Sequence, residues 1–140
     1  MPVVDASVVV DWVAPHADPD GPAVRFLDAV VAEGEAVLGP RLLKEEVSNA
    51  LLTGVRRRRW SGAAADRAFL LLVDLPLRLV DEPVDLERAW ELSRRYDEHP
   101  VYDMLYVAVA ERLRLQLVTA DRVLCDRLSR LGFVRPLVDG

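Results

Sequence analysis

The chain has 140 residues and a formal net charge of −5; 51% of its residues are hydrophobic and 29% are charged. These proportions are typical of one soluble globular domain over residues 1–140 and exclude a disordered chain. No apolar run approaches the roughly 18 residues of a membrane span, the single cysteine excludes a disulfide framework, and the acidic balance argues against binding nucleic acid through a broadly basic surface. The N-terminus shows no signal-like segment, so we expect a cytoplasmic protein.

The first half of the chain alternates short apolar runs with helical patterns. An apolar run ending at Val4 predicts a strand buried on both faces, with Asp5 directly after it. Ser7 is placed to cap the helix predicted over Ser7–Val13. Pro40 is expected to open a long helix, because proline suits a first turn. Together the patterns predict helices over residues 23–32, 41–58 and 63–74 and strands over residues 36–39 and 77–80.

The second half continues the alternation and contains an unusually apolar helix. That helix is predicted over residues 102–114, and its composition indicates a central position. A helix over 85–96 is expected to turn Leu86, Ala89 and Trp90 inwards. A strand over 115–119, a helix over 122–131 capped by Gly132 and an edge-like strand over 133–137 follow. This alternation predicts an α/β fold with a parallel sheet and helices on both faces.

Four acidic residues stand among apolar neighbours instead of in polar loops. Asp5 and Asp121 each follow a buried strand directly. Asp103 opens the apolar helix, and Glu46 lies on a helix whose other inward positions are mostly apolar. A buried charge without a partner is costly, and a divalent cation is the simplest partner that all four can share. Mg²⁺ and Mn²⁺ take oxygen ligands, and such a site suits phosphodiester hydrolysis.

Each of these acids also has a purely structural interpretation. Asp5 and Asp121 could cap the helices that follow them. Asp103 could be an acid favoured by the dipole at a helix N-terminus. Glu46 could be a surface acid beside Glu45. Any one of these interpretations is reasonable, but all four holding together is less so.

Four ordered segments of the chain carry a resemblance to a known family. They are Val3–Val8, Pro40–Leu51, Tyr102–Ala108 and Leu117–Asp121. In order and spacing they resemble the PIN-domain nucleases, most closely the VapC-type toxins of bacterial toxin–antitoxin pairs. The resemblance implies catalytic and metal-binding roles for Asp5, Glu46, Asp103 and Asp121, and supporting polar roles for Ser7, Asn49 and Thr119.

Two further acids compete with this set. Glu45 is the rival of Glu46, which is preferred because the family pattern places the acid directly before Val-x-Asn-Ala, here Val47 to Ala50. Asp126 corresponds to an additional acid of some relatives and is equally well interpreted as a helix-surface residue.

The same resemblance implies a PIN-like fold with a five-stranded parallel sheet. It also implies cleavage of RNA that depends on Mg²⁺ or Mn²⁺, and a role as the toxin of a type II toxin–antitoxin pair. The expected partners are the RNA substrate, a cognate antitoxin protein and a second copy of the chain in a homodimer. Contact with DNA is expected only indirectly, through the antitoxin, and no membrane contact is expected.

A run of four arginines is placed near the tip of the hairpin expected from the helices over 41–58 and 63–74. It consists of Arg56, Arg57, Arg58 and Arg59. The run could grip RNA phosphates or an acidic partner segment. It could equally be a solvated helix end, where cations favour the dipole. Trp60 is interpreted as a packing residue, and His16 and His99 as loop histidines without a catalytic role.

Two other functions compete with the nuclease interpretation. Haloacid-dehalogenase-like phosphatases also begin with a strand that ends in Asp, but they usually need a second Asp two positions later, where this chain has Ser7. A non-enzymatic PIN-fold protein that only binds a partner has no evident need for four buried carboxylates. A nuclease assay with and without Mg²⁺ distinguishes the enzyme from the binding protein.

Overall fold

The computed structural model describes residues 1–137, so residues 138–140 of the expected domain lie outside the described residues. The described chain forms a five-stranded sheet in the order β3-β2-β1-β4-β5, with every neighbouring pair parallel. The strands are β1 (Val3–Val4), β2 (Val37–Pro40), β3 (Leu77–Val80), β4 (Leu117–Thr119) and β5 (Val134–Pro136). The helices are α1 (Ala6–Val13), α2 (Pro22–Ala32), α3 (Leu43–Arg56), α4 (Gly62–Asp74), α5 (Pro83–Arg95), α6 (Val101–Leu113) and α7 (Arg122–Arg127), followed by the 3₁₀ turn η1 (Ser129–Leu131).

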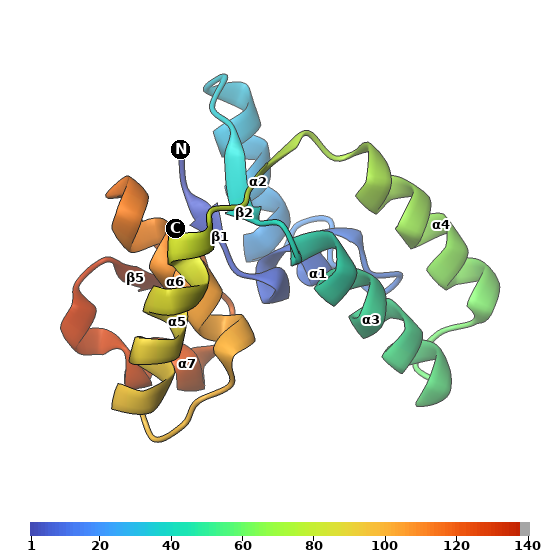
Figure 1. Cartoon of the computed structure of the whole chain (residues 1–140). Helices are drawn as coiled ribbons and strands as arrows, with labels where there is room; N and C mark the ends of the chain where they lie inside the picture. Colours follow the sequence, from blue (N-terminus) through green and yellow to red (C-terminus); the bar gives the residue numbers. More distant parts are fainter. Residues whose placement is uncertain (138–140) are drawn as a thin grey trace.

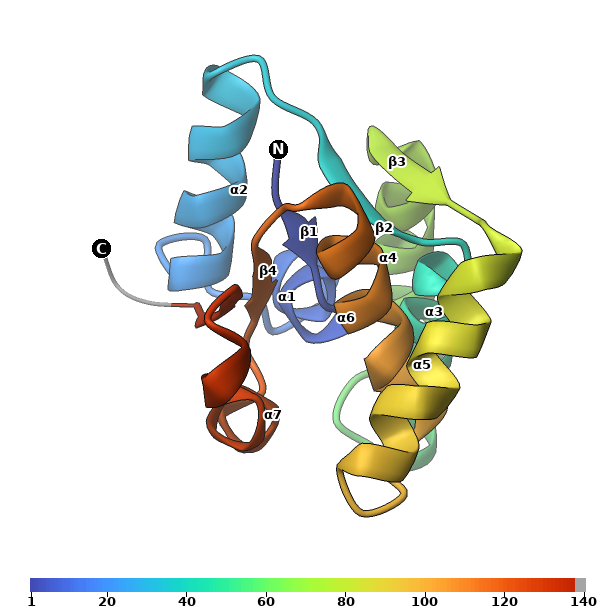
Figure 2. The same ribbon diagram turned by 60° about the vertical axis from the view of Figure 1, so that its left-hand side comes forward.

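The short strand β1 is the centre of the sheet. Val3 and Val4 are fully buried, and they pair with β2 on one side and β4 on the other. Figure 2 shows α2 on one side of these strands and α6, with α5 outside it, on the other. The predicted parallel α/β fold with helices on both faces is therefore confirmed.

The helix α6 is buried almost all round, which confirms its predicted central position. The side chains of Met104 and of Tyr106 to Ala110 are essentially inaccessible to solvent. A helix that is apolar on all sides belongs in a core, here between the sheet and α5. No helix in the part of the chain that the structure describes is both long and apolar enough to cross a membrane.

The inward face of α5 differs from the prediction. Leu86 and Trp90 are 58% and 64% exposed. The inward positions include Asp85, which is 4% exposed, together with Ala89. Arg112 on α6 donates to both Asp85 oxygens, from Nε at 2.7 Å and from Nη2 at 3.0 Å. The face was mispredicted because Asp85 is buried through its ion pair with Arg112, whereas the apolar pattern favoured Leu86 and Trp90.

Two positions near the helix starts also differ from the prediction. Pro40 is the last residue of β2, paired with Val80, and α3 begins only at Leu43. Ser7 lies inside α1 and does not cap it, because its hydroxyl donates to the side chain of Asp5.

The predicted helix over 122–131 is divided into α7 and η1, and Gly132 ends it in the left-handed conformation (φ 73°), as expected for a C-cap.

The helices α3 and α4 form the predicted hairpin, which extends away from the rest of the molecule in Figure 1. The helix α3 ends at Arg56, two residues earlier than expected, because Trp60 folds back onto it. Trp60 Nε1 donates to the Leu51 carbonyl at 2.9 Å. Only glycine fits under the indole, since a Cβ on Gly54 would lie 2.1 Å from a ring carbon.

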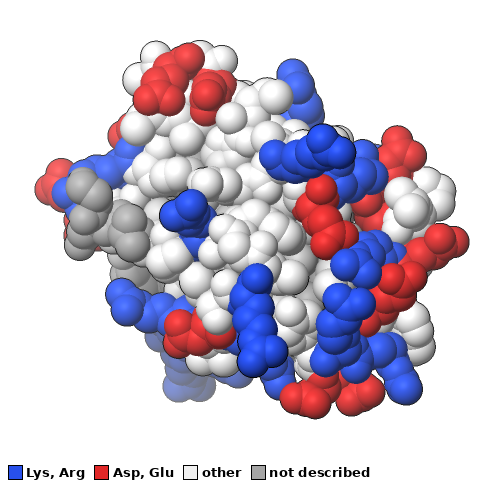
Figure 3. All heavy atoms as spheres, turned by 90° about the vertical axis from the view of Figure 1, so that its left-hand side faces the viewer, with Lys and Arg blue, Asp and Glu red and all other residues white. Residues whose placement is uncertain are grey.

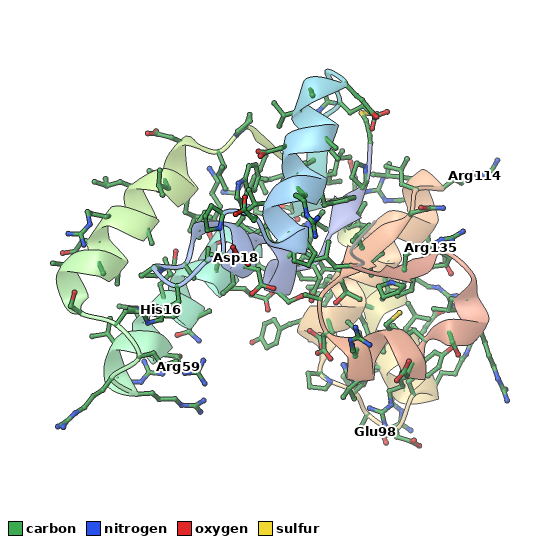
Figure 4. The ribbon with its side chains drawn as sticks, turned by 180° about the vertical axis from the view of Figure 1, so that it is seen from behind. His16, Asp18, Arg59, Glu98, Arg114 and Arg135 are labelled. Carbon is green, nitrogen blue, oxygen red and sulfur yellow. The ribbon has the colours of Figure 1, made fainter. Side chains whose placement is uncertain are left out.

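The tip of the hairpin is held against the loop after α1. His16 Nε2 donates to the Arg59 carbonyl, and the two residues lie beside each other in Figure 4. The His16 ring also meets the Trp60 indole edge-on, with 5.6 Å between ring centroids. Trp60 is therefore a packing residue, as predicted.

Candidate active site

The side chain of Asp5 is held at the carboxyl end of β1, next to the end of β4. It is 5% exposed and does not cap α1. Two hydroxyls donate to its Oδ2 atom, Ser7 Oγ at 2.6 Å and Thr119 Oγ1 at 3.0 Å. Each hydroxyl accepts a backbone N–H in turn, from Ala120 and Asp121 respectively. These backbone contacts direct both hydroxyl protons towards Asp5, so the carboxylate is oriented before anything binds to it.

Glu46 lies in the first turns of α3 and meets a tyrosine of the central helix. Glu46 and the Tyr106 hydroxyl interact, but Glu46 Oε1 and the hydroxyl oxygen are both buried and neither makes a hydrogen bond of good geometry. A buried polar atom without a partner carries its full desolvation cost. Glu45, the rival of Glu46, is exposed on the same helix.

Asp103 lies in the first turn of α6 and contacts His99, two residues before the helix begins. His99 Nε2 lies 2.6 Å from Asp103 Oδ2, and Arg127 Nη1 on α7 lies 2.9 Å from His99 Nδ1. His99 lies in the loop between α5 and α6, as predicted, and it directly contacts Asp103, a predicted site residue, which the sequence did not indicate.

Asp5, Glu46 and Asp103 form one acidic cluster, in which their charges act on one another. Burial raises the pKa of Asp5, and the charge of Asp103 raises it further against the hydrogen bonds from Ser7 and Thr119, which lower it. Burial also raises the pKa of Glu46; the Tyr106 hydroxyl lowers it, and the charges of Asp5 and Asp103 raise it.

Tyr106 responds to the same cluster. Burial raises the pKa of the Tyr106 hydroxyl far above its usual range, and the charge of Glu46 adds to the shift. The hydroxyl therefore stays protonated beside Glu46.

Two other predicted site residues, Asp121 and Asn49, have exposed side chains. Asp121 is exposed, and its Oδ1 atom accepts the Leu124 N–H at 3.1 Å, so it caps α7. Asn49 is exposed and lines a groove between α3 and α4 with Ser48 and Phe69. Asp121 therefore caps α7, as one interpretation predicted, but the cap uses only its Oδ1 atom.

The four arginines of the run are all exposed. They span the end of α3 and the start of the turn to α4, where Arg58 adopts a left-handed conformation (φ 57°). Arg56 donates to Thr53 Oγ1 at 2.9 Å. On the opposite side of the molecule, which includes α7, basic and acidic side chains are interspersed (Figure 3).

The carboxylates are the candidate ligands for Mg²⁺ or Mn²⁺. Within residues 1–137, no three Asp, Glu, His or Cys side chains form a ready-made group that could hold a metal ion. Asp5, Glu46 and Asp103 nevertheless act on one another electrostatically, and Glu46 contributes a buried oxygen without a partner. Hard divalent cations favour carboxylate oxygens and retain several waters, so they do not need a complete protein cage. The donor set therefore fits such a cation.

Sequence reasoning missed three residues of this neighbourhood. His99 stands four positions before Asp103, a spacing that indicates proximity if the helix starts between them. Tyr106 reads as an ordinary core residue of an apolar helix. Arg127 carries no local signal, because only the fold brings α7 beside the α5–α6 loop.

The strand order and the acids that follow β1 and β4 define a parallel α/β protein. Its polar site lies at the carboxyl ends of these two strands. The chain belongs to the PIN domain family, whose sequence model matches residues 3–130. The predicted family membership is thus confirmed. No curated protein matches the chain by sequence.

Solved structures with the same fold include VapC20 and FitAcB. The chain is similar to VapC20 of Mycobacterium tuberculosis, described as a sarcin–ricin loop cleaving toxin, with a TM-score of 0.65 and 23% identity over 96% of this chain and 97% of that one. It is also similar to FitAcB of Neisseria gonorrhoeae, with a TM-score of 0.61 and 16% identity over 96% of each chain.

Proposed function

We propose that this chain is a metal-dependent endoribonuclease and the toxin of a type II toxin–antitoxin pair. The observation that carries the proposal is the cluster of Asp5, Glu46 and Asp103 near the carboxyl end of β1, in a chain of the PIN domain family. Asp121, at the end of β4, is the fourth candidate acid. The same fold in VapC20, described as a toxin that cleaves the sarcin–ricin loop, supports RNA as the substrate.

In this proposal the protein's own residues hold and orient the acidic cluster. Asp5, Glu46 and Asp103 would bind Mg²⁺ or Mn²⁺, with Asp121 at the edge. The cation supplies positive charge that favours deprotonation of water and offsets charge on the phosphate. Ser7 and Thr119 orient Asp5 through their hydrogen bonds. Asn49, exposed on α3, keeps its proposed supporting role.

RNA cleavage is expected only in the presence of a divalent cation. Purified protein should cut a sarcin–ricin hairpin or an unstructured RNA with Mn²⁺ or Mg²⁺, stop with EDTA and resume when the cation is restored. Gel analysis of end-labelled RNA measures this. Cleavage that persists after thorough chelation, and is absent from an Asp5→Asn preparation, would contradict the metal-dependent site.

The arginine run is proposed to bind RNA, and not to take part in the chemistry. Replacing Arg57 and Arg58 by glutamine should weaken RNA binding and reduce the slope of log affinity against log salt by about 1.4, the value for two phosphate contacts on a single strand. Binding measured at several salt concentrations tests this, with Arg78→Gln and Arg135→Gln together as a control of equal charge away from the hairpin. An unchanged slope would leave the run as a solvated helix end.

The partners are proposed on the same basis. A cognate antitoxin protein would inhibit the chain, a second copy would complete a homodimer, and the antitoxin would make any contact with DNA in the cytoplasm. A short reading frame directly upstream of the gene, whose product copurifies with the chain and blocks cleavage, would support this assignment.

The alternatives have less support. In a phosphatase of the haloacid-dehalogenase type, position 7 would carry an acid for proton transfer, whereas here it carries Ser7, whose hydroxyl donates a hydrogen bond to Asp5. A PIN-fold protein that only binds a partner would have no use for a partnerless buried oxygen on Glu46. The cleavage assay separates this second alternative from the enzyme.

A further inference from the structure

A chain of contacts joins α7 to the first turn of α6 through His99. Arg127 Nη1 lies 2.9 Å from His99 Nδ1, and His99 Nε2 lies 2.6 Å from Asp103 Oδ2. The His99 side chain is 11% exposed and that of Asp103 is 30% exposed. Arg127 Nη2 also lies 3.6 Å from Asp97 Oδ2 in the α5–α6 loop. His99 is therefore enclosed between a fixed cation and a carboxylate of the site.

The direction of each hydrogen bond follows from donor chemistry. A guanidinium nitrogen can only donate, so His99 Nδ1 accepts from Arg127 and carries no proton. The neutral imidazole then carries its proton on Nε2, which donates to Asp103 Oδ2. Arg127 thus selects the His99 tautomer that can hold Asp103. The other tautomer would place two donors against each other at Nδ1.

We propose that His99, held in this tautomer by Arg127, is a positioning residue that orients Asp103 for cation binding and RNA cleavage, a role that rests on the function proposed above. A carboxylate with one oxygen already engaged has less rotational freedom to lose when a cation binds. Asp5 is oriented by Ser7 and Thr119 in the same manner. Two acids of the cluster thereby have a fixed orientation, each through a different part of the fold.

A purely structural role would have different consequences. If the contact served only to attach α7 to the α5–α6 loop, its removal would lower the melting temperature and leave the affinity of the folded protein for a cation unchanged. Hydrogen-bonding partners of metal-binding groups typically change metal affinity or activity by 10–100-fold. Cation affinity is therefore the measurement that separates the two roles.

The first experiment measures Mn²⁺ binding to the folded full-length protein by calorimetry. His99→Ala should raise the dissociation constant for Mn²⁺ about 10–100-fold, and Arg127→Ala should raise it in the same direction by less. His99→Gln keeps a donor and an acceptor, so it should recover part of the loss. Arg130→Ala, which removes an exposed arginine from η1, is the matched control for charge and should leave the constant unchanged.

The second experiment reads the tautomer without any metal. The chain has only two histidines, so His99→Gln assigns the imidazole ¹⁵N signals of His99 and His16. Wild type should show His99 protonated at Nε2 and unprotonated at Nδ1, and Arg127→Ala should weaken this preference. A His99 ring protonated at Nδ1 in wild type would overturn the positioning role.

The outcomes distinguish this role from the proposed function itself. A wild type that binds Mn²⁺, with folded His99→Ala binding it equally well, would overturn only the role of His99. A wild type that binds neither Mn²⁺ nor Mg²⁺ would overturn the metal site and the positioning role with it. In steady-state cleavage, a fall in kcat with little change in KM for RNA would support the role, whereas a change in KM alone would count against it.

Discussion

Replacing Asp5 by asparagine is expected to lower the rate of RNA cleavage by several orders of magnitude while the fold is retained. The substitution keeps the shape of the side chain, and the asparagine oxygen can still accept from Ser7 and Thr119, the two donors to Asp5. It removes the most deeply buried charge of the acidic cluster. Because a bound cation would supply both the activated water and the stabilisation of charge on phosphate, a loss at its site affects both. Single-turnover cleavage in Mn²⁺ measures the effect.

The matched control for this change is Asp126→Asn. Asp126 is exposed on α7, and it is the additional acid whose role the sequence left open. Its substitution should leave cleavage within about twofold of wild type if it is a surface residue. Equal losses from Asp5→Asn and Asp126→Asn, or wild-type activity in folded Asp5→Asn, would contradict the proposed role of Asp5.

The fold could be predicted because short-range patterns determine most of it. The run Val3–Val4 before Asp5 has no polar face, so it fits only a strand covered on both sides. The segment over 101–113 is apolar over its central turns, with Asp103, Glu111 and Arg112 near its ends, and this composition favours a central helix. Element boundaries were less predictable, since Trp60 ends α3 through a contact with Gly54 and a hydrogen bond to Leu51.

The candidate site was predictable only in part, because several of its contacts join residues that are far apart in the sequence. Asp5 and Thr119 come together because each lies at the carboxyl end of a strand and the two strands are neighbours. Asp85 gave no signal of burial, because its partner Arg112 lies on another helix. The pairing of His99 with Arg127 likewise depends on the packing of α7 beside the α5–α6 loop. Charge pairs of long sequence separation are set by tertiary structure, which local periodicity does not encode.

The acidic cluster also predicts an unusual response of stability to Mn²⁺. Without a cation, Asp5, Glu46 and Asp103 repel one another only in the folded state. Glu46→Gln removes one of these charges, so in EDTA its melting temperature should equal or exceed that of wild type. A cation that binds only the native state at a hundredfold excess over Kd stabilises it by about 2.7 kcal/mol. For a chain of 140 residues this corresponds to a rise of about 9 °C in wild type, and Glu46→Gln should gain clearly less.

The dependence on pH follows from the raised pKa values of Asp5 and Glu46. The native state binds these protons more tightly than the unfolded chain, so protonation contributes to the free energy of unfolding. For Glu46 this contribution is complete below its ordinary pKa of 4.5, and it is lost as pH rises through the raised pKa of the folded protein. In EDTA, the advantage of Glu46→Gln over wild type should therefore grow as pH rises from about 4.5 towards neutrality. Melting curves at several pH values measure it.

Two substitutions serve as controls for the stability response. Glu45→Gln makes the same chemical change one position earlier, at an exposed side chain, and should leave both the EDTA and the Mn²⁺ melting temperatures unchanged. Asp121→Asn keeps a good cap for α7 at Leu124, so any reduction in its response to Mn²⁺ measures participation of Asp121 in the site and not loss of the cap. If wild type, Glu45→Gln and Glu46→Gln all shift equally with Mn²⁺, Glu46 does not belong to the site. The buried Glu46 oxygen without a hydrogen bond would then only lower the stability of the fold.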